Sequence, residues 1–204
     1  MFLLITGASG VGKSTVRRLV EAEFAAVLEA AELAEVAGPP QWSLRWRHQA
    51  VEKAVQRAVQ IQRIGTHYLL CGDPVPPGEV LAAPSADRLD RIAVCLLDAS
   101  AEAQQTRLLH RGDDPTLIPH HIAFAAWLRE HIADPAYRPD VIVQGGWKRM
   151  RWDRWITADP QQPPWNGLVI DTTERSPIEV ADRVAAWIRQ QIDGVKSDVD
   201  QFKP

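Results

Sequence analysis

The stretch Gly7-Ala8-Ser9-Gly10-Val11-Gly12-Lys13-Ser14 matches the pattern G-x-x-x-x-G-K-[ST] at every defined position. The apolar run over residues 2–6 ends directly before it and predicts a buried strand. A helix over 13–24 is predicted by apolar residues at helical spacing, namely Val16, Leu19, Val20 and Phe24. Strand, glycine-rich turn and helix thus follow in the order that a phosphate-binding loop requires.

The residue types in this stretch suit the binding of phosphate. Glycines let backbone N–H groups turn inward and approach a phosphate closely, and the helix N-terminus adds a partial positive charge. We expect Lys13 to reach the β- and γ-phosphates of a nucleotide and the Ser14 hydroxyl to ligate Mg²⁺. The expected nucleotide-binding residues of the loop are Gly7, Ala8, Ser9, Gly10, Val11, Gly12, Lys13, Ser14 and Thr15.

The rest of the chain alternates short apolar runs with amphipathic segments. Further buried strands are predicted at 67–71, 92–97 and 168–170. Helices are predicted at 42–64, 101–111, 117–133 and 177–192. This alternation predicts an α/β fold with a mainly parallel sheet flanked by helices, in which ligands bind beyond the carboxyl ends of the strands.

Four stretches are less regular. Residues 25–38 fit either a strand near 26–28 or more helix, and the prolines of residues 73–85 predict a loop. Residues 134–166 are rich in Pro and Trp and are expected to be irregular. The polar residues 193–204 predict a frayed end.

Composition narrows the class of protein. The 204 residues carry 23 Lys and Arg against 26 Asp and Glu, and the absence of a basic run speaks against nucleic acid as the main partner. No apolar stretch approaches the ~20 residues that span a bilayer, and no basic region opens the chain as in a secretion signal. We therefore expect a cytoplasmic protein without membrane contact, with one domain over 1–194 and a polar tail over 195–204.

With these motifs the sequence resembles the P-loop kinases related to nucleoside and nucleotide kinases. In that family the phosphate loop opens the chain, a carboxylate ends a central strand, an arginine-bearing lid follows the next strand, and the last strand leads to a loop that lines the adenine. The matching positions are Gly7–Ser14, Asp73, Arg107 with Arg111, and Asp171–Thr173. The resemblance implies the P-loop NTPase fold and the use of ATP and Mg²⁺. The N-K-x-D motif of GTPases and the L-S-G-G-Q signature of ABC ATPases do not occur in the sequence.

Two carboxylates compete for the role beside the phosphates. Asp98 follows the apolar run 92–97 as in a Walker B pattern, but it precedes a helix, where a turn or capping role suffices. We favour Asp73, which would hold Mg²⁺ or take the proton from an attacking hydroxyl. The sequence Gly72-Asp73-Pro74-Val75-Pro76 departs from the D-G-x-P-R element of many nucleotide kinases, which speaks against a nucleoside monophosphate as acceptor. Glu79 is a weaker candidate in the same loop.

Arg107 and Arg111 lie four residues apart on a predicted helix and therefore share one face. A cation placed over the transferring phosphoryl group would assist catalysis, and two solvated surface arginines are the alternative. By the resemblance, Arg107 would also stack on the adenine, and Thr172 would lie in the loop beside it.

The acceptor is expected near the start of the helix over 42–64. This helix feeds the strand at 67–71, so it begins at the carboxyl edge of the sheet. Candidate acceptor-binding residues on its first two turns are Trp42, Arg45, Trp46 and Gln49. The alternative is plain hydrophobic packing of the two Trp side chains, with Arg45 in solvent.

A Trp-rich, lid-like insertion is expected within residues 105–166. Its segment 127–165 has three possible roles: a cover that closes over an apolar acceptor, a subdomain that packs on itself, or a dimer patch.

The function predicted from the sequence is phosphotransfer from ATP, with Mg²⁺, to a hydroxyl of a small molecule such as a nucleoside, a sugar or an antibiotic-like compound. The alternative is an ATP-binding regulatory module that hydrolyses ATP slowly, in which the Trp-rich segment docks a protein partner.

Overall fold

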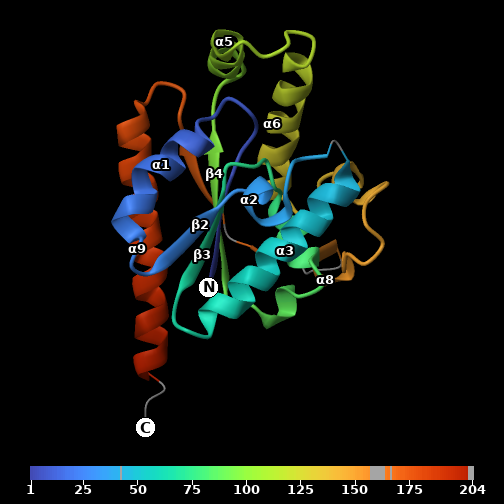
Figure 1. The fold of residues 1–204 in the computed structure, drawn as a ribbon. Helices are drawn as coiled ribbons and strands as arrows, with labels where there is room; N and C mark the ends of the chain where they lie inside the picture. Colours follow the sequence, from blue (N-terminus) through green and yellow to red (C-terminus); the bar gives the residue numbers. More distant parts are fainter. Residues whose placement is uncertain (42, 157–163, 166, 202–204) are drawn as a thin grey trace.

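The computed structural model describes residues 1–41, 43–156, 164–165 and 167–201, with side chains described through residue 194. A five-stranded parallel sheet forms its centre, in the order β2-β3-β1-β4-β5 (Figure 1). The strands are β1 (Phe2–Thr6), β2 (Leu28–Ala31), β3 (His67–Cys71), β4 (Ile92–Asp98) and β5 (Gly167–Asp171). Because β1 is the middle strand, the loop after it leaves from the centre of the sheet's carboxyl edge.

Two layers of helices cover the sheet. Successive residues of a strand point to opposite faces, so Leu3 and Ile5 pack against α1 (Lys13–Phe24) and α9 (Pro177–Gln201). Phe2 and Leu4 face the opposite layer, which contains α3 (Leu44–Gln62) and α6 (Ile118–Ala133). Figure 1 shows α1 and α9 together on one side of the sheet and α3 and α6 on the other. Both faces are buried, which explains why the central strands are continuously apolar.

Helix ends near the site follow local side-chain chemistry. The Ser100 hydroxyl accepts the N–H of Ala103 at 3.1 Å and starts α5 (Ala101–Arg111), which ends at Gly112 in the left-handed region. Glu32 and Glu35 form a reciprocal capping box at the start of α2 (Leu33–Ala37). These caps fix where α2 and α5 begin, next to the carboxyl edge of the sheet.

Several segments differ from the sequence-based expectation. Within 25–38 the strand alternative is confirmed, but the strand lies at Leu28–Ala31 rather than near 26–28, and α2 follows it. The expected loop over 73–85 contains α4 (Pro77–Ala82), and a 3-10 turn, Ala86–Arg88, follows it. Pro77 suits a first helical turn, and Val80 and Ala82 are fully buried, so packing converts a proline-rich stretch into helix. Two short helices, α7 (Asp140–Val143) and α8 (Asp153–Ile156), interrupt the expected irregular region. Helix α9 continues to Gln201 instead of fraying after residue 192.

The Trp-rich segment packs on itself and on the sheet's helices. The side chains of Trp127, Trp155 and Trp165 are all buried. His131 lies among them and stacks on Trp127, with ring centroids 4.7 Å apart. Each of the three indole N–H groups donates to a backbone carbonyl. Of the three roles expected for this segment, the packing agrees best with a subdomain that packs on itself, although these side chains join the core of the sheet and do not form a separate unit.

In the described part of the chain, no helix combines the length and the hydropathy needed to cross a bilayer.

Candidate active site

The loop between β1 and α1 has a backbone conformation that requires glycine. Gly7, Gly10 and Gly12 all have positive φ angles, of 149°, 88° and 95°. A Cβ on Gly7 would lie 2.3 Å from the carbonyl oxygen of Leu97 in β4, so a side chain there would push into the neighbouring strand. The predicted loop therefore has the fixed, inward-turned backbone that phosphate binding needs.

Lys13 reaches back over this loop from the first turn of α1. Its side chain is buried, and the ammonium group donates a hydrogen bond of 2.8 Å to the carbonyl oxygen of Ala8. Burial lowers the pKa of Lys13 to about 8, since a desolvated ammonium is less stable than a solvated one. An anion beside this group would stabilise its charged form and raise the pKa again, and a phosphate is the anion whose binding the loop backbone favours.

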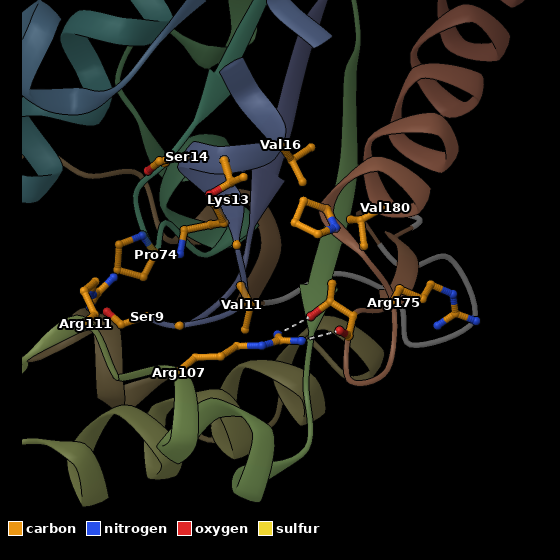
Figure 2. A pocket seen from close by; sticks show the side chains of 16 residues that line it. Ser9, Val11, Lys13, Ser14, Val16, Pro74, Arg107, Arg111, Arg175 and Val180 are labelled. Atoms are coloured by element: carbon orange, nitrogen blue, oxygen red, sulfur yellow. Dashed lines mark hydrogen bonds between the residues drawn. The ribbon is translucent and has the colours of Figure 1, made fainter. Parts of the chain in front are cut away.

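A first cavity of about 490 Å³ surrounds the loop. Figure 2 shows Lys13 and Ser14 on one side of it, Arg107 below Val11, and Arg111 beside Ser9 and Pro74. Arg175 extends toward the opposite end. The cavity is lined by Ser9, Gly10, Val11, Gly12, Lys13, Ser14, Thr15, Val16, Gly72, Pro74, Arg107, Arg111, Thr172, Arg175, Pro177 and Val180. It contains the expected phosphate-loop residues from Ser9 to Thr15, both predicted arginines and Thr172.

Arg107 joins helix α5 to the loop that follows β5. Its guanidinium donates to the Thr172 hydroxyl at 3.0 Å and to the carbonyl oxygens of Thr172 and Thr173. The dashed lines in Figure 2 mark the two bonds to Thr172. Thr172 is itself buried. Arg107 is therefore fixed in the wall of the cavity and is not a solvated surface residue.

A second cavity, of about 660 Å³, meets the first. Its lining residues come from the segments around α2, α3, β3 and α6: Ser9, Leu33, Pro40, Gln41, Ser43, Leu44, Trp46, Arg47, Asp73, Pro74, Arg111, Asp113, Asp114, Leu117, His121 and Phe124. Ser9, Pro74 and Arg111 line both cavities. Arg111 forms an ion pair with Asp113, so its charge lies at the junction between the two spaces.

The structure separates the two candidate carboxylates. Asp73 lies on the wall of the second cavity, and one of its oxygens accepts the N–H of Leu33 at 2.6 Å. Burial raises its pKa. Asp98 instead forms a bidentate ion pair with Arg129 of α6, at 2.6 and 2.9 Å, and lines neither of the two cavities. The geometry therefore favours Asp73 over Asp98.

The donor set is compatible with a magnesium–nucleotide complex. Ser14 presents an exposed hydroxyl group at the start of α1, and Gly72 and Pro74, which flank Asp73, line the same cavity. Hydroxyl and carboxylate oxygens are ligands that Mg²⁺ prefers, and in nucleotide sites it is held by few protein groups together with the phosphates. Among the described residues no cluster of three or more His, Cys, Asp or Glu side chains could hold a metal. Ser14 and Asp73 are thus suited to a site in which a magnesium ion is shared between the protein and the phosphates of a nucleotide.

The expected acceptor residues divide on helix α3. Trp46 lines the second cavity, whereas Arg45 and Gln49 are not among its lining residues. These two lie four residues apart on a neighbouring face of α3, and Arg45 is exposed. Trp42 lies outside the described residues.

Sequence reasoning missed Arg47, which lines the second cavity one residue after Trp46. Arg47 donates to the carboxylate of Glu79, which comes from α4, at 2.5 to 3.0 Å. The side chain of Glu79 is fully buried, and Arg47 keeps its pKa low even though burial alone would raise it. His48 contacts the same carboxylate at 3.4 Å. Arg47 and Glu79 lie 32 residues apart in the sequence, and Glu79 lies on a helix where a loop was expected. Sequence patterns therefore could not predict this ion pair.

No family model matches the sequence, and no curated protein matches it. Solved structures do resemble the fold. A gluconokinase from Sinorhizobium meliloti 1021 has a TM-score of 0.55 and 14% identity, covering 96% of this chain and 95% of its own. A sugar kinase from Janibacter sp. HTCC2649 has a TM-score of 0.52 and 17% identity, covering 92% and 94%. The APS kinase of Mycobacterium tuberculosis, in complex with AMPPNP and APS, has a TM-score of 0.52 and 15% identity, covering 92% and 96%. The chain therefore has the fold of the P-loop kinases.

Proposed function

We propose that this protein is an ATP- and Mg²⁺-dependent phosphotransferase that phosphorylates a hydroxyl group of a small molecule. The observation that carries the proposal is the meeting of two cavities at Ser9, Pro74 and Arg111. The first holds the phosphate loop and the buried Lys13, and the second has a carboxylate, Asp73, in its wall. Two adjoining spaces of this kind suit a reaction between two bound molecules better than simple hydrolysis.

The first cavity suits the nucleotide. The backbone N–H groups of the loop and the ammonium of Lys13 would bind the phosphates, at the N-terminus of α1. The base would lie toward the end of this cavity where the guanidinium of Arg107 is bonded to Thr172. The similar APS kinase structure, which contains AMPPNP together with APS, supports two ligands in a fold of this kind.

The second cavity suits the acceptor and its activation. The acceptor oxygen would attack the γ-phosphorus, the bond to the β-bridging oxygen would break, and ADP would leave. Asp73 would accept the hydroxyl proton or support the metal, while Lys13 and Arg111 would stabilise the charge on the transferring group. Mg²⁺, when bound through Ser14 and Asp73, neutralises charge on the phosphates. The raised pKa of Asp73 makes its carboxylate a better proton acceptor than an exposed one.

The alternative function, a regulatory ATP-binding module, loses support from the position of the Trp side chains. That alternative uses the Trp-rich segment to dock a protein partner. Trp127, Trp155 and Trp165 are buried in the core and do not present a surface to a partner, whereas Trp147 and Trp152 are half-buried.

An Asp73→Asn variant tests the proposal. We expect ATP or AMPPNP still to bind, and the rate of ADP formation with Mg·ATP and a panel of nucleosides, sugars and aminoglycosides to fall at least about 100-fold. Asp98→Asn serves as the matched variant, since it removes the competing carboxylate. A large loss of turnover in Asp98→Asn together with normal turnover in Asp73→Asn would show that the assignment is wrong.

A further inference from the structure

The second cavity has two arginines in its wall, and each is matched by an acidic side chain. Arg47 donates three hydrogen bonds to the carboxylate of Glu79, which is fully buried behind it. Arg111 pairs with Asp113. A buried carboxylate cannot exchange its partner for water, so Glu79 keeps Arg47 paired. The pair has little net charge with which to attract an anionic ligand.

Two further carboxylates in the same wall have no such match. Asp73 accepts a hydrogen bond from the N–H of Leu33, and Asp114 accepts hydrogen bonds from the N–H and the hydroxyl of Thr116. Neither forms an ion pair with a residue in the described part of the chain. If Arg111 turns toward bound phosphates, Asp113 also loses its partner. The carboxylates of this wall therefore outnumber the cations left unmatched in it. Lys13 also acts on Asp73 from the first cavity, but the phosphates of a bound nucleotide would engage its charge. With nucleotide bound, the electrostatic environment of this cavity is acidic.

Most of the remaining wall is apolar. Side chains from three parts of the fold face the cavity, namely Leu33, Pro40, Leu44, Trp46, Leu117 and Phe124. Aromatic and branched aliphatic side chains around a space of about 660 Å³ favour an apolar body, while the few polar groups orient the ligand.

We propose that the acceptor is an amphipathic alcohol with an apolar, ring-sized body and no anionic group, and that an additional cationic group is tolerated or preferred. This inference rests on the proposed function, because it assigns the second cavity to the acceptor. Alcohols that carry a carboxylate or a phosphate are disfavoured, because their charge would lie near the partly buried carboxylate of Asp73 and the exposed carboxylate of Asp114.

Three compounds with a common body test the inference: biphenyl-4-methanol and its 4′-aminomethyl and 4′-carboxyl derivatives. Their binding to the full-length protein is measured by calorimetry in the presence of Mg·AMPPNP at low salt, where charge effects are weakly screened. We expect the carboxyl derivative to bind at least tenfold more weakly than the parent alcohol, and the aminomethyl derivative to bind as tightly or more tightly. Equal or tighter binding of the carboxyl derivative, or no binding of any of the three up to their solubility, would overturn the inference.

Two variants test the assigned charges. Glu79→Gln leaves the charge of Arg47 unmatched, so the carboxyl derivative should gain at least fivefold in affinity relative to the parent alcohol. Asp114→Asn keeps an oxygen that can accept the hydrogen bonds from Thr116 and removes one negative charge. The preference, which is the ratio of the affinities for the parent alcohol and the carboxyl derivative, should therefore fall two- to threefold. Glu130→Gln, an exposed position on α6, is the control that should leave the preference unchanged. If Glu79→Gln does not fold, Asp114→Asn decides, and an unchanged preference there contradicts the inference.

The same compounds distinguish this inference from the proposed function when Mg·ATP replaces the analogue. Binding in the expected order without a phosphorylated product, as detected by mass spectrometry, would contradict the kinase proposal alone. Preferred phosphorylation of the carboxyl derivative would contradict the acceptor inference and support the kinase proposal.

Discussion

Lys13 is the residue on which the nucleotide site depends most. Its ammonium group is buried and makes one hydrogen bond to Ala8, which is fewer than the three that an ammonium can donate. Burial has already lowered its pKa to about 8 in the absence of a ligand. A bound phosphate would supply the missing acceptors and the missing negative charge.

The affinity for ATP should therefore depend on pH. A phosphate stabilises the ammonium form, so the pKa of Lys13 should be higher in the complex than in the free protein. Above pH 8 the free protein has lost this proton and must take it up on binding, so the dissociation constant should rise up to about tenfold per pH unit from pH 8 to pH 10. Below pH 8 the proton is already present. Calorimetry in buffers of different ionisation enthalpy measures both the affinity and the proton uptake.

Lys13→Arg is the matched variant for this experiment, because an arginine stays charged throughout the window even if its shape weakens binding. A dissociation constant for the unaltered protein that stays flat from pH 7 to pH 10 would contradict the proposed contact between Lys13 and the phosphates.

At the residue scale, the sequence predicts what depends on neighbours in the chain. Lys13 and Ser14 follow from an eight-residue pattern, and Arg107 and Asp73 follow from their places after strands. Arg47 could not be predicted to face the acceptor cavity, because its direction depends on a buried partner, Glu79, from a distant helix.

Helix α4 shows at the element scale why local propensity can mislead. The prolines of residues 73–85 predict a loop, yet Pro77 starts a helix whose next residues are buried. Trp155 of α8 donates its indole N–H to the carbonyl oxygen of Gly78 at 2.8 Å. A Cβ on Gly78 would lie 2.7 Å from the same indole. The helix is thus stabilised by a tertiary contact that sequence patterns do not encode.

Replacement of Trp155 should test how much this contact contributes. Trp155→Phe removes the indole N–H, leaves the buried Gly78 carbonyl without its donor and opens a small cavity, so the free energy of unfolding should fall by about 2–3 kcal/mol. Ile156→Ala is the control, because that neighbouring side chain is 40% exposed and its loss should change stability by less than about 1 kcal/mol. Urea unfolding followed by circular dichroism measures both. Equal losses in the two variants would contradict a stabilising role for the α4–α8 contact.

At the scale of the whole molecule, a packed core supports the two cavities. The central strands β3, β1 and β4 are buried on both faces, and the Trp cluster extends the core under α4 and α6, the elements that supply Glu79 and Phe124. The parallel sheet flanked by helices agrees with the fold class predicted from the strand–helix alternation. The packing of the Trp-rich segment could not be chosen from sequence, because a cover, a subdomain and a dimer patch share the same composition.

His131 makes the stability of this core dependent on pH. Burial among the Trp side chains lowers the pKa of His131 to about 4, below the value of about 6.5 for an unfolded chain. Between these values the unfolded chain binds the proton and the folded protein does not, so stability falls as the pH drops from about 6.5 toward 4.

Between pH 7 and pH 5 the free energy of unfolding of the unaltered protein should fall by about 2 kcal/mol more than that of a His131→Leu variant, as measured by urea unfolding. His120→Leu, which alters an exposed histidine of the same helix, should behave like the unaltered protein. Equal losses of stability on acidification in all three proteins would show that His131 is not the group responsible for the pH dependence.

The proposed reaction moves a phosphoryl group from ATP in the first cavity to a hydroxyl in the second. The most direct test measures ADP formation from Mg·ATP together with the mass of each acceptor in a panel of alcohols, for the unaltered protein and for Lys13→Ala. We expect at least one acceptor to gain a phosphoryl group and to raise ADP formation, with both effects lost in Lys13→Ala. ADP formation that no acceptor changes and that persists in Lys13→Ala would show that the protein is not such a kinase.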